Sequence, residues 1–175
     1  GLPGDNFSLE GALDLFKKAS SPEDFEKMLN TESNHVNNLD LNEDGDIDYI
    51  RVISKMDTDV HAFILQVPIS DSENQDIAVI ELEKNGKESA VIQIVGDEDI
   101  FGVQQIVEPS DENDMKGEMK MEPRTKSGPS AINFEEDDAI VINVWPWSCV
   151  RFVYAPAYRP WISPWRWRVY PSYWH

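Results

Sequence analysis

The residues best suited to chemistry lie in one short stretch, 40–48, which is crowded with acidic side chains. Side-chain oxygens stand at its first, third, fifth and ninth positions, on Asp40, Asn42, Asp44 and Asp48. Gly45 occupies the sixth position, where a sharp turn needs its conformational freedom, and an apolar residue follows at the eighth to fix the loop to a core. Because four aspartates and one glutamate in this stretch repel one another, the pattern favours a hard cation with oxygen ligands.

The spacing resembles the DxDxDG calcium loops of EF-hand, dockerin and FG-GAP proteins. Position twelve carries Arg51 instead of the bidentate glutamate of an EF-hand, and a strand rather than a helix is expected next. Asp48 at position nine can close the ligand shell, as in the FG-GAP form. The resemblance therefore implies a Ca²⁺ ion held by the side chains of Asp40, Asn42, Asp44 and Asp48 and by the backbone carbonyl of Asp46.

The same loop has two alternative interpretations, a metal-free turn rich in Asp and Asn and a Mg²⁺ site. Mg²⁺ fits less well, because it demands tight octahedral geometry and keeps its waters. Since no nucleophile lies beside the loop in the sequence, a structural clamp between helices and sheet is favoured over a catalytic metal. Loops of this kind bind calcium weakly, so we expect a periplasmic or extracellular protein, where calcium is plentiful.

Other groups capable of acid–base or nucleophilic chemistry are scattered along the chain. His61 shares the face of an expected strand with apolar neighbours, and Cys149 lies among prolines and tryptophans, which predicts a buried, inert thiol. Two acidic runs, 97–99 and 135–138, are typical of solvated turns, and would support catalysis only if they met a histidine in a cleft. With no GxSxG, HExxH, P-loop or GxGxxG motif, we predict no catalytic residues.

The elements that must position the acidic loop begin with two amphipathic segments. Ser8 can cap a helix whose apolar stripe is Leu9, Ala12, Leu13, Phe16 and Ala19. Ser21 and Pro22 suit the first positions of a second helix, with Phe25, Met28 and Leu29 as its stripe. The two segments predict a helical hairpin.

From residue 49 onward, apolar residues alternate with polar ones, which predicts strands over 49–56, 60–69, 76–84, 88–95 and 101–108. Asn85-Gly86 is the strongest hairpin signal, because both residues tolerate the positive φ that a tight turn needs. Consecutive strands with short connections form an antiparallel meander. The expected fold is therefore α+β, with an N-terminal helical hairpin packed on an antiparallel β-meander of four to six strands.

The remaining chain predicts two further parts. Residues 109–130 are polar, and their three methionines, Met115, Met119 and Met121, fit a mobile loop better than a soft-metal site. Segments 139–145 and 150–154 are strand-like and can rejoin the sheet. The expected organisation is a domain over 1–108, a mobile polar loop over 109–130, and a strand pair with an aromatic, proline-rich extension over 131–175 that packs on the same domain.

Charge is distributed unevenly over the 175 residues, whose 33 acidic and 15 basic side chains give a net charge of −18. Residues 1–144 contain all the acids and sum to −22, whereas 145–175 contain four arginines, all six tryptophans and no acid. Nucleic acid and anionic lipid are poor partners for most of such a surface. One cysteine excludes an intrachain disulfide, and no apolar run is long enough for a transmembrane helix.

The aromatic C-terminal part has three possible roles. It can pack on the acidic body with its arginines against carboxylates, or bind a glycan, peptide or other cell-envelope component. It can also lie at a membrane interface, although five prolines argue against an amphipathic helix there. The candidate contact residues are Trp145, Trp161, Trp165 and Trp167.

The first residue is Gly1 instead of Met, which fits either a removed secretion signal or an expression scar. As a whole the chain resembles a secreted bacterial protein. These features together predict a calcium-stabilised extracytoplasmic binding or envelope-associated protein with no evident catalytic site. The alternative is a calcium-dependent hydrolase that acts on a cell-surface polymer.

Overall fold

The computed structural model describes residues 3–41, 43–109 and 142–174. Five strands form one antiparallel sheet in the order β1-β2-β3-β4-β5, so the predicted α+β fold with a meander is confirmed. No helix in the described ranges is long and apolar enough to cross a membrane. The elements in chain order are η1 Pro3–Asn6, α1 Leu9–Lys18, α2 Pro22–Leu29, η2 Glu32–Asn34, β1 Arg51–Asp57, β2 Val60–Pro68, β3 Asn74–Gly86, β4 Ser89–Gly96, α3 Glu98–Phe101, β5 Gln105–Val107 and α5 Ser148–Val153.

The helical hairpin forms where its capping residues predict it. The Ser8 hydroxyl accepts a hydrogen bond from the Gly11 amide at 2.8 Å, which satisfies an otherwise unpaired amide at the start of α1. The Ser21 hydroxyl does the same at the start of α2. Phe16 of α1 contacts both Phe25 of α2 and Phe63 of β2, each with ring centroids 5.2 Å apart. The two helices are thereby packed on the sheet.

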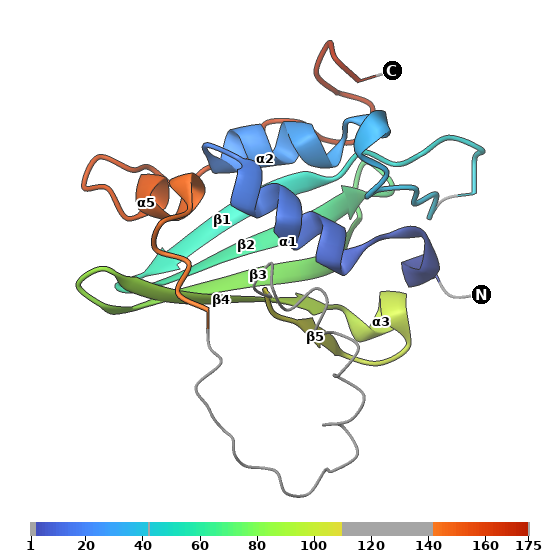
Figure 1. The fold of residues 1–175 in the computed structure, drawn as a ribbon. Helices are drawn as coiled ribbons and strands as arrows, with labels where there is room; N and C mark the ends of the chain where they lie inside the picture. The colour runs from blue at the N-terminus through green and yellow to red at the C-terminus, as the bar shows by residue number, and fades with distance from the viewer. Residues whose placement is uncertain (1–2, 42, 110–141, 175) are drawn as a thin grey trace, which may run out of the picture.

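The sheet buries one face under the helices, and α1 and α2 lie across that face with α5 beside them (Figure 1). Alternate residues of the central strands enter this core, as the period of two predicts. Examples are Phe63 and Leu65 of β2, and Ile92 and Ile94 of β4.

Two sequence predictions about the strand ends are wrong. The turn between β3 and β4 falls at residues 87–88, and neither Asn85 nor Gly86 has a positive φ. A register irregularity between Lys84 and Gly86 keeps Asn85 and Gly86 within β3. The turn therefore forms at the next two residues of the chain. The strand expected over 101–108 is shorter than predicted and consists of β5 alone, Gln105–Val107. Phe101 is instead the last residue of the short helix α3.

The strand expected over 150–154 is also wrong, because residues 150–153 belong to helix α5 and Tyr154 is its C-cap. Cys149, Val150 and Val153 are all buried, and a helix places this spacing on one face, whereas a strand would point Cys149 and Val150 to opposite sides. Of the other expected strand, 139–145, residues 142–145 lie in no strand and the rest fall outside the described residues. The three methionines and residues 110–130 of the expected polar loop also fall outside them.

The chain after α5 returns along the edge of the sheet. The Ser54 amide donates to the Trp161 carbonyl at 2.7 Å, and the Ser163 amide donates to the Val52 carbonyl at 3.1 Å. Ile162 between them bridges Ile53 in antiparallel fashion. The C-terminal segment therefore covers the edge of β1, whose backbone would otherwise be open to pairing with another chain.

Candidate metal centre

The acidic loop connects η2 to β1, and hydrogen bonds fix both of its ends. The Asp48 amide donates to the Leu39 carbonyl at 2.7 Å, and the Asn37 side chain donates to the Asp48 carbonyl at 2.7 Å. Just beyond the loop, the Asn30 side chain at the end of α2 both donates to and accepts from the backbone of Ile50. The loop is therefore held between the helical layer and the first strand.

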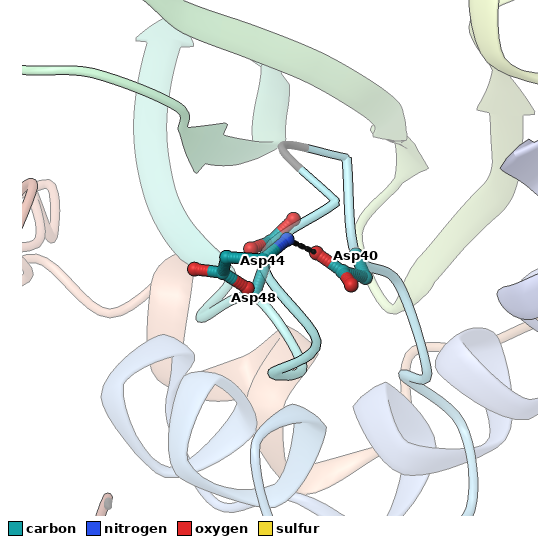
Figure 2. Close-up of side chains that lie close together, drawn as sticks. All are labelled: Asp40, Asp44 and Asp48. Atoms are coloured by element: carbon teal, nitrogen blue, oxygen red, sulfur yellow. Dashed lines mark hydrogen bonds between the residues drawn. The ribbon is translucent and has the colours of Figure 1, made fainter.

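Three carboxylates of this loop converge, as Figure 2 shows. Asp40, Asp44 and Asp48 each offer an oxygen, and these oxygens all lie within 4.8 Å of one another. The Asp48 side chain is buried, that of Asp40 is half-buried and that of Asp44 is exposed. The structure thus brings together the first, fifth and ninth positions of the sequence motif, in an arrangement that could hold a metal ion.

The loop backbone is curled around the Asp40 carboxylate. This carboxylate accepts hydrogen bonds from the amides of Asp44 at 3.1 Å and Gly45 at 2.8 Å. Two residues adopt positive φ to allow the curl, Glu43 at 59° and Gly45 at 91°. Glycine at the sixth position is therefore required by the backbone, as the sequence pattern indicates, because a side chain there would be strained.

Crowding of the carboxylates changes the acidity of the buried one. Burial and the negative charges of Asp40 and Asp44 together raise the pKa of Asp48 to about 6, against the hydrogen bond from the Leu41 amide at 2.5 Å. Its ionised form is thus disfavoured by its surroundings. A divalent cation in the cluster would reverse this effect by supplying the missing positive charge.

The other two ligands expected from the sequence are Asn42 and the backbone carbonyl of Asp46. Asn42 lies outside the described residues. Asp46 is exposed and its carboxylate is not one of the three that converge, while its amide donates to the Asp44 carboxylate at 2.9 Å. The sequence interpretation gave Asp46 a role through its carbonyl only, and that role stays a prediction.

Comparison with known proteins gives no match. No protein-family model, no curated protein and no solved structure matches the chain.

Among the described residues, the other side chains capable of acid–base or nucleophilic chemistry do not assemble into a second site. His61 is buried against the rings of Tyr154 and Tyr158, and this burial lowers its pKa. Cys149 is buried too, and burial raises the pKa of its thiol, which keeps it protonated. Asp97 caps α3 by accepting from the Asp99 amide, and no described contact joins it to a histidine. The acidic run 135–138 lies outside the described residues.

Sequence reasoning missed one functional group, the carboxylate of Glu26. This side chain is 1% exposed, although glutamate is rarely buried. The helical spacing contained the signal, because Pro22, Phe25, Glu26 and Leu29 stand at the one-face positions of α2 and are all buried. An acid in that stripe has to find donors or lose its charge.

Four hydrogen bonds satisfy the Glu26 carboxylate. Oε1 accepts from the Val52 amide at 2.9 Å and from the Trp161 indole at 3.0 Å. Oε2 accepts from the Ser163 hydroxyl at 2.9 Å and from the hydroxyl of Tyr49. Burial nevertheless raises the pKa of Glu26 above its ordinary value, and the four donors oppose this shift. Since Tyr49 directly follows Asp48, this network begins where the acidic loop ends.

Proposed function

We propose that the loop over 40–48 binds Ca²⁺ and that the protein is a calcium-stabilised binding or envelope-associated protein that works outside the cytoplasm. The observation that carries this proposal is the convergence of Asp40, Asp44 and Asp48 within 4.8 Å on one curled loop. Three like charges at this separation repel one another, and a bound cation turns that repulsion into attraction.

The donor set favours calcium among the common cations. All the candidate ligands are oxygens, which excludes the soft metals that prefer thiolate or imidazole. An irregular loop of carboxylates and carbonyls suits the six to eight flexible oxygen contacts of Ca²⁺ at about 2.3–2.6 Å better than the strict octahedron of Mg²⁺. Asn42 and the Asp46 carbonyl complete the proposed shell beside the three carboxylates.

The site acts as a clamp at the point where the sheet begins. Asp48 is followed by Tyr49 and Ile50, which are both buried and hydrogen-bonded to side chains of α2 or its C-cap. A cation that fixes the Asp48 carboxylate therefore also restricts the strand start against the helical layer. Because the ion binds the folded loop and not the unfolded chain, its binding free energy adds to the free energy of unfolding.

Two features support a place outside the cytoplasm. One-loop sites with few ligands bind calcium weakly, so they are filled where free calcium is high. Helix α5 and the C-terminal segment also leave large apolar side chains exposed, Phe152 and Ile162 among them, as expected for a protein that associates with another surface.

Thermal unfolding with calcium and with chelator tests the ion. At a calcium concentration about a hundredfold above Kd, binding adds about 2.7 kcal/mol, which raises Tm by about 5–10 °C for a chain of this size. Asp40→Asn should lose most of this shift. Glu43→Gln removes a charge from the same loop without removing a proposed ligand, so it should keep the shift.

Titration calorimetry with Ca²⁺ and Mg²⁺ checks the same proposal directly. One calcium should bind per chain, with magnesium much weaker. The absence of both a calcium heat and a Tm shift would sink the proposal, and a shift retained in Asp40→Asn would place the ion elsewhere.

A further inference from the structure

The C-terminal segment contains a closed turn, which we call the aromatic tip and define as residues 165–169, Trp-Arg-Trp-Arg-Val. The Arg166 amide donates to the Val169 carbonyl at 3.0 Å, and the Val169 amide donates back to the Arg166 carbonyl at 2.7 Å. Trp167 and Arg168 form the turn between them, with Arg168 at a φ of 65°. The tip therefore has a defined backbone shape without being a helix.

The body of the protein holds the aromatic tip from both sides. Before it, Trp161 and Ser163 donate to the buried Glu26, and the Arg51 guanidinium donates to the Trp165 carbonyl at 3.0 Å. After it, the rings of Tyr170 and Trp174 pack on Tyr49 with centroids 5.6 and 5.3 Å apart. A surface fixed in this way loses little conformational entropy when it binds a partner.

The side chains of the aromatic tip combine positive charge with apolar area. Arg166 and Arg168 are exposed, Val169 is 38% exposed, and both tryptophans are half-buried. The Arg168 guanidinium lies over the Trp167 ring, 5.3 Å from its centroid. Within the described residues, no arginine of the tip forms an ion pair with a carboxylate. The positive charges are thus free to meet an external anion.

The Trp and Arg side chains of the aromatic tip indicate which kind of partner it binds. Tryptophan rings and arginine side chains are favoured together at the headgroup level of a bilayer, where guanidinium groups bind phosphate. Sugar recognition usually needs acid or amide side chains to accept from hydroxyls, and the tip has none. Residues 145–175 carry a charge of +4 and the rest of the chain −22, so an anionic surface attracts this end and repels the body.

We propose that the aromatic tip docks the protein on an anionic lipid surface, with Arg166 and Arg168 on lipid phosphates and Trp167 and Val169 at the headgroup boundary. The inference names the partner for the envelope role proposed above and rests on that role. The acidic body favours one orientation of the contact, because a negative surface repels the body and attracts the tip.

Vesicle binding by the full chain tests the proposal. The intrinsic tryptophan fluorescence serves as the reporter, because all six tryptophans lie in 145–174. Mixed phosphatidylglycerol and phosphatidylcholine vesicles should shift the emission to the blue and sediment the protein, and pure phosphatidylcholine vesicles should do neither. One interfacial cation corresponds to about a fivefold change in affinity, so the double variant Arg166→Gln/Arg168→Gln should bind about 25-fold more weakly.

A matched variant and two further arms separate the possible outcomes. Lys87→Gln removes one positive charge, as Arg166→Gln or Arg168→Gln alone does, but from the exposed turn between β3 and β4, and should bind as the unchanged protein does. The proposal is overturned if Lys87→Gln weakens vesicle binding equally, or if the protein does not bind anionic vesicles. It is also overturned if inorganic phosphate displaces the protein from the vesicles, or if the protein binds only a soluble anionic polysaccharide. All titrations are repeated in chelator. Binding that persists there, with no calcium heat, supports the tip while the calcium proposal fails, and calcium binding without vesicle binding shows the reverse.

Discussion

This protein contains two groups of carboxylates whose negative charge is stabilised in opposite ways. They are Glu26 and the cluster of Asp40, Asp44 and Asp48. Glu26 is alone, buried and surrounded by four donors. The three aspartates lie within 4.8 Å of one another and accept mainly from amides of their own loop. The first group is satisfied by the chain, whereas the second is suited to an external cation.

The origin of the donors explains why the two groups have different roles. The donors to Glu26 come from β1, from Tyr49 and from the C-terminal segment, more than 130 residues away in the case of Trp161 and Ser163. Removing Glu26 therefore affects the packing of distant segments. Within the described residues, the amides that donate to the aspartates lie two to seven residues away along the chain, so these contacts are local to the loop.

Replacing Glu26 should have the largest effect. Glu26→Ala leaves the Val52 amide, the Trp161 indole and the Ser163 hydroxyl without this acceptor and a cavity beneath the C-terminal segment, so we expect a loss of about 3–5 kcal/mol in the free energy of unfolding. Urea denaturation followed by tryptophan fluorescence measures this loss, and the native spectrum should also shift to the red as Trp161 is released.

Glu26→Gln is the matched control for that change. Its amide oxygen can keep the bonds from Val52 and Trp161, while its NH₂ group can donate to the hydroxyls of Tyr49 and Ser163, which accept as well as donate. We therefore expect a loss below about 1 kcal/mol. An equal loss in both variants would show that the carboxylate and its hydrogen bonds, rather than the packing of the side chain, make the site stable.

Asp48→Asn should have effects of opposite sign with and without calcium. In chelator, the change removes a buried charge from a repelling cluster and keeps an acceptor for the Leu41 amide, so stability should rise by up to about 1 kcal/mol. With calcium, a ligand charge is lost, and affinity should fall about tenfold or more, or about 1.4 kcal/mol. Melting curves under both conditions measure the two signs, and a loss in both would remove the electrostatic distinction between the groups.

Stability should depend on pH through Glu26 in a direction set by its raised pKa. The folded state holds this proton more tightly than the unfolded chain, so the stabilisation is complete below the ordinary value of 4.5 and is lost as pH rises through the folded pKa. One proton limits the slope to about 1.4 kcal/mol per pH unit. The difference between unchanged protein and Glu26→Gln, measured in chelator, isolates this component, and parallel pH profiles would contradict it.

The parts of the fold that the sequence predicted depend on local rules. Ser8 and Ser21 cap helices by contacts three residues away, and alternation along β2 and β4 follows from burying one face of a sheet. The convergence of Asp40, Asp44 and Asp48 is local as well. Helix α5 was missed because its residues also suit a strand, and only packing against α1 decides between the two states. The partners of Glu26 are set by the tertiary fold. The spacing of apolar residues along α2 therefore indicates that Glu26 is buried but does not identify its hydrogen-bond donors.

Tyr49→Phe should have the smallest effect on calcium affinity and tests whether the two groups are independent, since Tyr49 adjoins Asp48 in sequence and contacts Glu26 in space. The variant loses the hydroxyl that donates to Glu26 and bonds Tyr173 at 2.9 Å, yet keeps the ring against Trp174, so we expect a loss of about 1 kcal/mol. Calcium affinity should change less than about twofold, because Asn37 and Leu39 hold the Asp48 backbone without Tyr49. Calorimetry on both proteins measures this. A larger loss of affinity would mean that the buried network and the acidic loop form one coupled unit, in which calcium also controls how the C-terminal segment is held.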